Sequence, residues 1–382
     1  MSGTIKLGDA ATYINGYAFK PEDRGDKGLP IIRIQDLTGN AYDIGFYNGE
    51  YPRKIEINDG DVLISWSASL GVYVWNRGKA LLNQHIFKVV FDKAKINKEY
   101  FVYAVRRKLV EMASKTHGAT MKHIVKKDFD TTEIPYPEMN RQLEIANTLD
   151  KVSYVIEARK KELEEFDNLI KSRFVELFGD PVLNTLNLQT KPMTELCQII
   201  DGDRGKNYPT VEEFSEEGYC LFLNAKNVTS TGFNFDNCMF VTQEKDEVLR
   251  KGKLQRGDVV LTTRGTIGNL AFYTHEIPYE HVRINSGMVI LRMFQTEIDE
   301  VYFIEQFKMQ LADIKEKIAS GSAQPQLPIS TMNKIQVILP RIEMQKEFTN
   351  FVKQVDKLKV EVQKSLDETQ QLMDSLMQKY FG

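Results

Sequence analysis

The sequence predicts an α+β protein with an internal pseudo-twofold repeat, in which two β-rich domains alternate with two long helices that pair as an antiparallel coiled coil. Three observations lead to this prediction. The sequence matches itself when shifted, both halves end in coiled-coil spacing, and both begin with short alternating runs typical of strands. The predicted boundaries are 1–137 for the first domain, 138–180 for its helix, 181–340 for the second domain and 341–382 for its helix.

The repeat is most regular at the end of each half. A shift of 203 positions superimposes matched glycines, prolines and glutamines: Gly118 on Gly321, Pro137 on Pro340, Gln142 on Gln345 and Gly179 on Gly382. Upstream the match requires gaps, but 60–71 (GDVLISWSASLG) aligns with 257–268 (GDVVLTTRGTIG), and 7–16 (LGDAATYING) with 193–202 (MTELCQIIDG). A duplication without functional meaning is one interpretation. We favour a shared frame that carries two different readers, because only one part of each half has diverged.

From Pro137 onward, apolar residues recur in steps of four and three, which is the spacing of a coiled-coil seam. The predicted helix–helix interface is Ile145, Leu149, Val152, Ile156, Leu163, Phe166 and Ile170 in the first helix, and Phe348, Val352, Val355, Val362, Leu366 and Met373 in the second. The same spacing continues to Leu177 and Tyr380. Gly179, which is followed by Pro181, should end the first helix. Each helix is expected to pair with the other, and packing against its own domain is the alternative.

The two variable domains should combine strands with helices. Residues 1–136 and about 185–338 contain short runs rich in β-branched and aromatic residues, separated by turn signals. Helical stretches are expected at 96–114 and 297–320. Each domain is therefore predicted to hold one strongly bent sheet with helices at one side.

Polar side chains at the strand ends are the candidate contacts to DNA. Arginine can make a bidentate contact to guanine, serine and threonine can contact several base edges, and amides can read adenine. The alternatives are a surface salt bridge for Arg264 and strand-end or turn hydrogen bonds for the amides. The candidate set is Arg33, Gln35, Trp66, Ser67, Asn83, Gln84, His85, Asn224, Lys226, Thr263, Arg264, Arg283, Asn285, Ser286 and Gln324. The Gly- and Ser-containing stretches before the helices suit either a flexible approach to phosphates or a plain connector.

Composition and motifs argue against catalysis in this chain. A net charge of −3 is unusual for a free-standing nucleic-acid binder unless a partner supplies positive charge. The chain has no Pro-Pro pair, as the catalytic tetrapeptide of a DNA methyltransferase would require, no phosphate-binding loop and no H-E-x-x-H. Three unpaired cysteines, no basic-then-apolar start and no long apolar run predict a cytoplasmic protein without a metal site.

The whole pattern resembles the specificity (S) subunit of type I restriction-modification systems. The resemblance covers almost the entire chain and is carried by the paired GDV strands, the P-x(4)-Q motifs at Pro137/Gln142 and Pro340/Gln345, and a G-x-x-Q-like stretch at 321–324. The first copy of that last stretch departs from the pattern, since Met121 stands where the second has Gln324.

The resemblance implies that each variable domain is a target-recognition domain that reads one half of an asymmetric, bipartite site in double-stranded DNA. The helices would act as a spacer ruler and as the seat of two methyltransferase (M) subunits, with restriction (R) subunits completing the complex. S-adenosylmethionine, ATP and Mg would then reside on the partners, and no cofactor, catalytic residue or membrane contact is expected in this chain. A coiled-coil scaffold with two protein-binding β-rich domains is the alternative.

Overall fold

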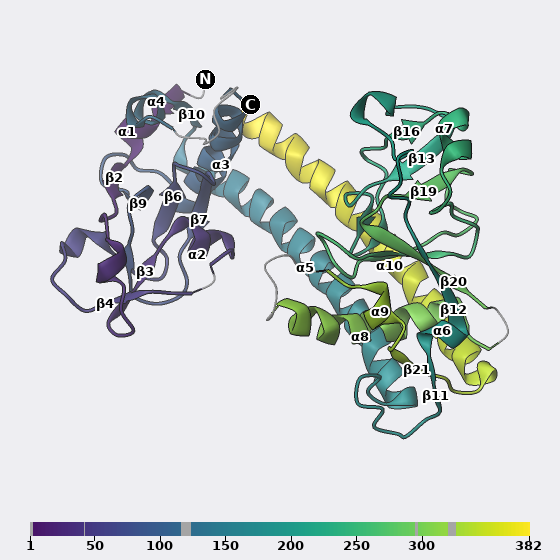
Figure 1. Ribbon diagram of the computed structural model, residues 1–382. Helices are drawn as coiled ribbons and strands as arrows, with labels where there is room; N and C mark the ends of the chain where they lie inside the picture. Colours follow the sequence, from purple (N-terminus) through teal and green to yellow (C-terminus); the bar gives the residue numbers. More distant parts are fainter. Residues whose placement is uncertain (1–2, 42, 116–123, 295–296, 320–325) are drawn as a thin grey trace. The chain divides into compact units, whose positions relative to one another are not determined.

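The structure is a computed structural model that describes residues 3–41, 43–115, 124–294, 297–319 and 326–382. The chain forms two compact units: unit 1 consists of Met1–Lys160 and Lys364–Gly382, and unit 2 of Lys161–Gln363. The two long helices, α5 (Met139–Phe178) and α10 (Ile342–Phe381), contribute one segment each to both units (Figure 1). Among the described residues, no helix is long and apolar enough to cross a membrane.

Unit 1 begins with the first β-rich domain. In chain order its elements are β1 (Gly3–Lys6), α1 (Leu7–Ala10), β2 (Thr12–Asn15), β3 (Leu29–Ile32), α2 (Ile34–Thr38), β4 (Phe46–Tyr47), β5 (Glu56–Ile57), β6 (Val62–Ser65), β7 (Gly71–Val74), β8 (Ala80–Leu82), β9 (Ile86–Val90), α3 (Lys98–Lys115), α4 (Lys126–Thr131) and β10 (Glu133–Tyr136). Short 3-10 helices lie at Pro21–Asp23 and Arg53–Ile55. The core joins the β2–β9–β6–β7 sheet to α3 and the long helices.

Unit 2 contains the second β-rich domain. Its elements are β11 (Thr190–Pro192), α6 (Met193–Leu196), β12 (Cys197–Asp201), β13 (Cys220–Leu223), β14 (Val228–Thr229), β15 (Gly232–Phe233), β16 (Phe240–Val241), α7 (Gln243–Val248), β17 (Val259–Thr262), β18 (Leu270–Phe272), β19 (Val282–Ile284), β20 (Met288–Met293), α8 (Glu300–Ala319), α9 (Ile329–Met332) and β21 (Gln336–Ile338). A 3-10 helix lies at Val211–Glu213.

Both domains share one strand topology. An antiparallel sheet has the order β2-β9-β6-β7 in unit 1 and β12-β20-β17-β18 in unit 2. A separate sheet holds a parallel pair, β3 with β8 in unit 1 and β13 with β19 in unit 2. The predicted single bent sheet is therefore corrected to separate sheets, and each unit also has two-stranded sheets, β1-β10 in unit 1 and β11-β21 and β14-β15 in unit 2. The chain passes from one sheet to the other within three residues, 83–85 in unit 1 and 285–287 in unit 2, so no strand has to bend through both.

The long helices pair in opposite directions. In unit 1, Ile145, Leu149 and Ile156 from the first half of α5 share a core with Met373 near the end of α10. In unit 2, Ile170 near the end of α5 shares a core with residues from the start of α10, namely Phe348, Val352 and Val355. Of the remaining predicted seam residues, Val362 is buried, while the others are half-buried: Val152, Leu163, Phe166 and Leu366.

The last turns of both helices differ from the predicted seam. Leu177 and Tyr380 are only partly buried. The buried residues there are instead four apart: Phe174 and Phe178 in α5, and Met377 and Phe381 in α10. The reason is that each helix end also packs on a helix of the other half of the chain, α5 on α8 of the second domain and α10 on α3 of the first. The ring centroid of Phe174 lies 5.5 Å from that of Tyr302 in α8, and that of Phe381 lies 5.2 Å from that of Tyr100 in α3.

The P-x(4)-Q motif of the repeat is a buried junction between helices. Gln142 and Gln345 are 1% and 0% exposed. Oε1 of Gln142 accepts a hydrogen bond from the backbone N–H of Asn97, just before α3, at 2.9 Å, and Nε2 donates to the carbonyl oxygen of Pro137 at 2.8 Å. Gln345 makes the equivalent two contacts in unit 2, also at 2.9 and 2.8 Å. The repeated glutamine therefore satisfies polar groups that burial would otherwise leave without partners.

Candidate nucleic-acid interface

Three loops of unit 1 meet beyond the ends of β2, β6 and β8, and we call residues 16–17, 66–70 and 83–85 edge 1. Backbone hydrogen bonds join them: Tyr17 N–H to Leu82 O at 2.8 Å, Gln84 N–H to Tyr17 O at 2.9 Å, and Trp66 N–H to His85 O at 3.2 Å. A Cβ at Gly16 would lie 2.0 Å from the carbonyl oxygen of Asn83, so only glycine fits there. The loops are therefore held at fixed positions relative to one another.

Unit 2 forms the corresponding edge 2 from residues 202–204, 263–268 and 285–287. The backbone N–H groups of Thr263 and Arg264 both donate to the carbonyl oxygen of Gly287, at 2.8 and 3.2 Å. A Cβ at Gly202 would lie 2.2 Å from the carbonyl oxygen of Asn285, which matches the close approach in unit 1. The two edges thus share a backbone arrangement.

Further matched contacts align the two edges residue by residue. The hydroxyl of Ser65 donates to the carbonyl oxygen of Ser69, and the hydroxyl of Thr262 donates to the carbonyl oxygen of Thr266. The segment that approaches each long helix borders the same loop: Ile124 N–H donates to Trp66 O and Leu327 N–H to Thr263 O, both at 3.0 Å. Trp66 therefore corresponds to Thr263, and the next position holds Ser67 in unit 1 and Arg264 in unit 2.

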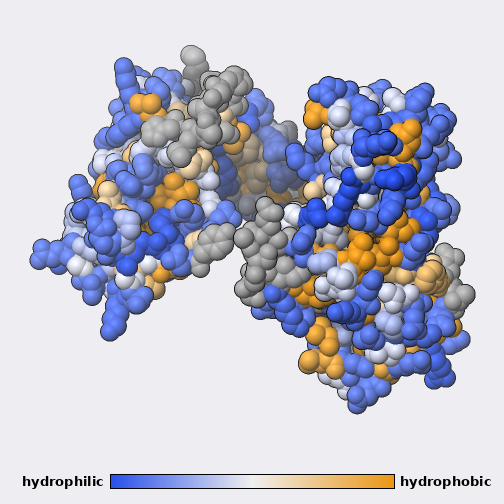
Figure 2. Space-filling view, in the orientation of Figure 1, coloured by the Kyte–Doolittle hydropathy of each residue, from blue (hydrophilic) through white to orange (hydrophobic). Residues whose placement is uncertain are grey.

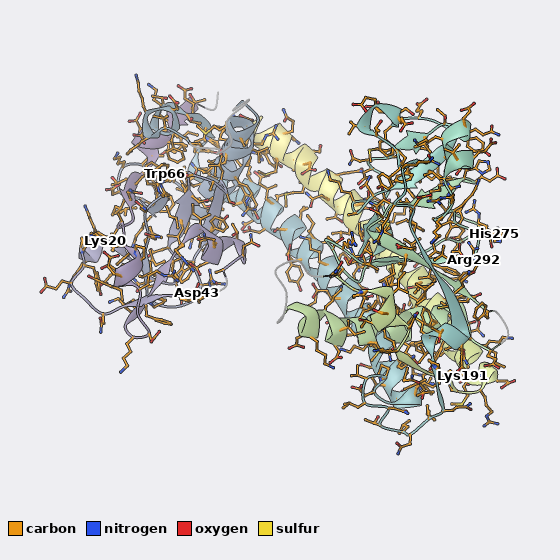
Figure 3. The ribbon with its side chains drawn as sticks, in the orientation of Figure 1. Lys20, Asp43, Trp66, Lys191, His275 and Arg292 are labelled. Atoms are coloured by element: carbon orange, nitrogen blue, oxygen red, sulfur yellow. The ribbon has the colours of Figure 1, made fainter. Side chains whose placement is uncertain are left out.

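The side chains of edge 1 are mainly aromatic and amide groups. Trp66, labelled in Figure 3, is half-buried and stacks on Phe87 with ring centroids 5.5 Å apart, while His85 meets it edge-on at 4.9 Å. Oδ1 of Asn83 accepts a hydrogen bond from the backbone N–H of Gln84 at 2.9 Å, so this amide supports the turn. Gln84 itself is exposed, and Ser67 is buried at 6% exposure. Gln84 is thus the predicted residue on this edge that is fully presented to solvent.

Edge 2 presents different chemistry on the same frame. The hydroxyl of Thr263 donates to Gly287 O at 3.0 Å and is buried, and Oδ1 of Asn285 accepts from Gly287 N–H at 2.8 Å. Both side chains therefore support loops. Arg204 donates to Oδ1 of Asp201 at 3.0 Å and to Ser286 O at 3.2 Å. Arg264 is exposed and Ser286 is half-exposed.

The prediction that Arg283 contacts DNA is corrected. Arg283 is 5% exposed in β19, and its guanidinium forms an ion pair with Asp246 and donates to the carbonyl oxygens of Leu249 and Lys251. Burial alone would raise the pKa of Asp246, but its ion pairs with Lys253 and Arg283 outweigh that effect and hold the pKa below its ordinary value. Arg283 therefore stabilises the interior of unit 2 and has no donor directed to a ligand.

The other candidates lie outside the two edges. Arg33 precedes α2 and forms ion pairs with Asp36 at 3.1 Å and Asp43 at 3.5 Å, while Gln35 in α2 is exposed. Two further residues follow β13: Oδ1 of Asn224 accepts from the backbone N–H of Lys226 at 2.9 Å, and Lys226 is exposed. Gln324, like the 118–121 stretch, lies outside the described residues.

Sequence reasoning missed the contribution of the strand end that carries Tyr17 in edge 1 and Arg204 in edge 2. Tyr17 is 43% exposed and packs edge-on against Phe19, with ring centroids 5.0 Å apart. The alignment of Gly16 with Gly202 was the signal for these positions, because a glycine directly after a strand often marks a close backbone approach.

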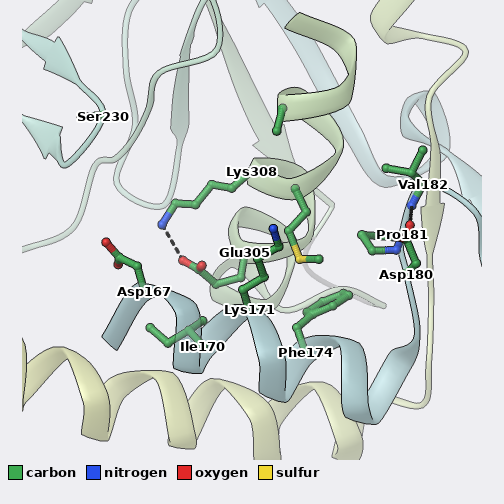
Figure 4. A pocket seen from close by; sticks show the side chains of 12 residues that line it. Asp167, Ile170, Lys171, Phe174, Asp180, Pro181, Val182, Ser230, Glu305 and Lys308 are labelled. Carbon is green, nitrogen blue, oxygen red and sulfur yellow. Dashed lines mark hydrogen bonds and ion pairs between the residues drawn. The ribbon is translucent and has the colours of Figure 1, made fainter. Parts of the chain in front are cut away.

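A cavity of about 340 Å³ in unit 2 is lined by residues of α5, of α8 and of the segment after α5 (Figure 4). Its carboxylates already have partners: Lys308 donates to Glu305 at 2.6 Å, Asp167 accepts from Lys359 at 2.6 Å, and Asp180 accepts from the backbone N–H groups of the two residues at 182 and 183. Within the part of the chain that the structure describes, no group of three or more His, Cys, Asp or Glu residues is arranged to hold a metal ion. Neither finding identifies a reactive group.

Comparisons with known proteins agree with one another. The family model described as "Type I restriction modification DNA specificity domain" matches residues 2–166 and 186–371. The chain is 23% identical over 409 residues to the type I restriction enzyme EcoBI specificity subunit of Escherichia coli, covering 99% of this chain and 85% of that protein. It is 24% identical over 381 residues to the MjaVIII specificity subunit of Methanocaldococcus jannaschii, covering 93% and 86%.

Solved structures show the same fold. The S subunit of a type I restriction-modification system from M. genitalium aligns with a TM-score of 0.50 at 19% identity, covering 100% of this chain and 96% of that one. A chain from work on complex assembly and conformational transition of the type I R-M system aligns with a TM-score of 0.55 at 15% identity, covering 99% and 97%. The alternation of β-rich domains and long helices is thus common to these proteins.

Proposed function

The chain belongs to the family of type I restriction-modification DNA specificity domains, and from that premise we propose that it reads an asymmetric, bipartite site in double-stranded DNA. The observation that carries the proposal is the pair of edges: one backbone arrangement holds unlike side chains at matched positions. Ser67 corresponds to Arg264 and Gln84 to Ser286. Because base edges are distinguished by the donors and acceptors they meet, unlike side chains on a common frame should read unlike half-sites.

The helices α5 and α10 would set the distance between the half-sites. Each contains 40 residues and contributes to both units, so each is about 60 Å long at the usual rise per residue. A spacer of this kind fixes how many unread base pairs separate the two sequences, as dimer geometry fixes half-site spacing in other readers.

The outer faces of these helices suit docking of two M subunits. In unit 1 they expose apolar side chains at Leu143, Tyr154, Val155 and Leu372, and in unit 2 at Leu169, Val175, Leu358 and Val360. Hydrophobic residues are visible on the surface of both units in Figure 2. Exposed apolar groups on a helix favour burial against a partner, and one such set in each unit suits two copies of the same partner.

The partners would supply what this chain lacks. With a net charge of −3 the isolated chain should hold phosphates weakly, so M subunits would provide most of the positive charge. They would also carry S-adenosylmethionine for adenine methylation, and R subunits would bring ATP and Mg for translocation and cleavage. In this proposal the chain selects the site and performs no catalytic step.

Methylome sequencing of cells that express the chain with its M partner tests the proposal. We expect one bipartite motif with two unlike halves and a fixed spacer. Methylation that is absent without this chain, and that follows a split motif with it, would support the reader function. A continuous motif, or a motif that does not depend on this chain, would overturn it.

A length variant tests the ruler separately. Seven residues inserted into each helix at the boundary of the units, after Lys160 and after Gln363, keep the seam spacing and add about 10 Å. We expect the spacer to lengthen by about three base pairs while both half-sites stay the same. A matched variant with seven residues in α5 alone should lose activity, because the seam then falls out of register.

A further inference from the structure

We propose that Arg264 selects a guanine in the half-site that unit 2 reads, which rests on the proposed function and makes it specific. Edge 2 offers two exposed arginines, Arg204, which is paired with Asp201, and Arg264, and arginine recognises the O6 and N7 atoms of guanine through two parallel hydrogen bonds. The matched position of edge 1 holds the buried Ser67, so the inference applies to one half-site alone.

The backbone that carries Arg264 is fixed on both sides. Its own N–H donates to Gly287 O, and it forms an isolated bridge with Gln326. The preceding Thr263 is held by its N–H and hydroxyl, both directed at Gly287 O, and by Leu327 N–H. A side chain presented from a rigid loop can meet a base edge in one geometry, which bidentate recognition requires.

The guanidinium of Arg264 is available for a ligand. Within the described residues it has no ion pair or side-chain hydrogen bond, whereas three other arginines of the domain are paired: Arg204 at the surface with Asp201, Arg283 with Asp246 and Arg292 with Asp258. A surface salt bridge, the alternative expected from the sequence, is therefore not formed among those residues. The space beside it is open, because a Cβ at Gly265 would meet nothing within 4 Å.

Base contact explains an arginine here better than phosphate contact does. A phosphate can be met by a flexible lysine acting as a point charge, and it does not need a fixed backbone. Residues 185–338 contain 16 Lys and Arg against 20 Asp and Glu, so this domain is not organised as a general anion-binding surface. One rigidly presented, unneutralised arginine on such a domain fits the recognition of a single base pair.

The test compares methylomes and competition binding of the complete complex, with its M partner, for wild type, Arg264→Ala and Arg264→Lys. For Arg264→Ala we expect preference for one G·C pair in one half-site to fall roughly 5- to 150-fold, with the other half-site unchanged. Arg264→Lys should keep most of the affinity and lose part of the preference. Lys334→Ala, an exposed cation elsewhere in unit 2, is the matched control and should change nothing.

Each other outcome has a distinct meaning. An affinity loss of the same factor on every sequence would make Arg264 a phosphate contact and overturn the inference, as would an unchanged motif. A wild-type complex with no bipartite motif would overturn the proposed function as well. The Gln84→Ala variant identifies the half-site that unit 1 reads. If Arg264→Ala weakened the preference for a guanine in that half-site, the assignment of Arg264 would also be contradicted.

Discussion

Units 1 and 2 agree in their interior polar contacts and differ at their edges. Tyr100 and Tyr302 occupy matched places in α3 and α8, and each hydroxyl donates to the carbonyl oxygen of a matched residue before the long helix, at 2.8 and 3.0 Å. Burial raises the pKa of both phenols. These contacts persist in both copies because a buried polar group must keep its partner, whereas the exposed side chains of Gln84 and Arg264 form no hydrogen bond or ion pair among the described residues that would constrain them.

The edges and surfaces have diverged in charge as well as in side chains. Residues 1–137 contain 20 Lys and Arg against 16 Asp and Glu, and residues 185–338 contain 16 against 20. The interior has diverged as well: Arg283 of β19 corresponds to Leu81 of β8, which is buried and apolar. Unit 2 thus carries a buried ion pair where unit 1 has hydrocarbon.

The largest expected effect comes from breaking that ion pair. Arg283→Met should destabilise unit 2 by about 3–5 kcal/mol, because Asp246 then remains buried with Lys253 as its one cationic partner among the described residues. Hydrogen exchange resolved by unit should show the loss in unit 2 alone. The control Arg264→Met removes an arginine from the surface and should change stability by less than about 0.5 kcal/mol. Equal effects of the two variants would contradict the interior role of Arg283.

The matched glutamines provide the next largest effect. Gln142→Ala and Gln345→Ala each leave buried backbone groups without partners and should cost about 1–3 kcal/mol. The two matched contacts have equal lengths, but Nε2 of Gln345 also donates to the carbonyl oxygen of Glu297 at 3.1 Å, so Gln345→Ala should cost more than Gln142→Ala by about 0.5–1.5 kcal/mol. Hydrogen exchange at the start of α3 and of α8 measures each one. Lys346→Ala, an exposed neighbour of Gln345, is the control. A larger cost for Gln142→Ala than for Gln345→Ala would contradict this expectation.

Much of this frame could be predicted because its signals are local. The constant shift between the halves marked the glutamine junctions, and the apolar spacing marked the helices and most of their seam. The family resemblance seen in the sequence is confirmed by the comparisons. The predicted seam differs from the structure at the helix ends, where Phe174 packs on α8 and Phe381 packs on α3, two helices that are distant in sequence.

The edges could be predicted only in part. Edge 1 and edge 2 were located at strand ends, but the sequence could not tell a supporting side chain from a presented one. Arg283 and Arg264 look alike in sequence but differ in the structure. Asp246, which lies 37 residues before Arg283, forms an ion pair with Arg283, whereas no acidic residue among those described pairs with Arg264. The aligned glycines 16 and 202 indicated where two backbone segments approach closely, but they did not indicate which side chains are exposed beside them.

A smaller effect links Asp246 to pH. Its pKa is lowered in the folded state, so its ionised form stabilises unit 2 above the ordinary pKa of aspartate, about 3.9, and this contribution is lost as pH falls through the lowered value. The stability difference between wild type and Asp246→Asn should therefore be largest near neutral pH and shrink on acidification below about pH 4. Denaturant unfolding of unit 2 across pH measures it. A difference independent of pH would mean that the charge of Asp246 contributes nothing.

The smallest expected effect concerns phosphate contacts, in which the two units should behave alike. Lys20 and Lys206 are both exposed and lie four residues beyond the aligned glycines (Lys20 is labelled in Figure 3). If each lysine contacts one phosphate, Lys20→Gln and Lys206→Gln should each make the negative slope of log K against log salt less steep by about 0.9. Each should also weaken binding to all DNA sequences equally. Salt titration of the complex on DNA measures this, with Lys334→Gln as the control. If either variant lost affinity for some DNA sequences more than for others, its lysine would contact bases. Base reading would then not be confined to the edges, and the two units would differ outside them as well.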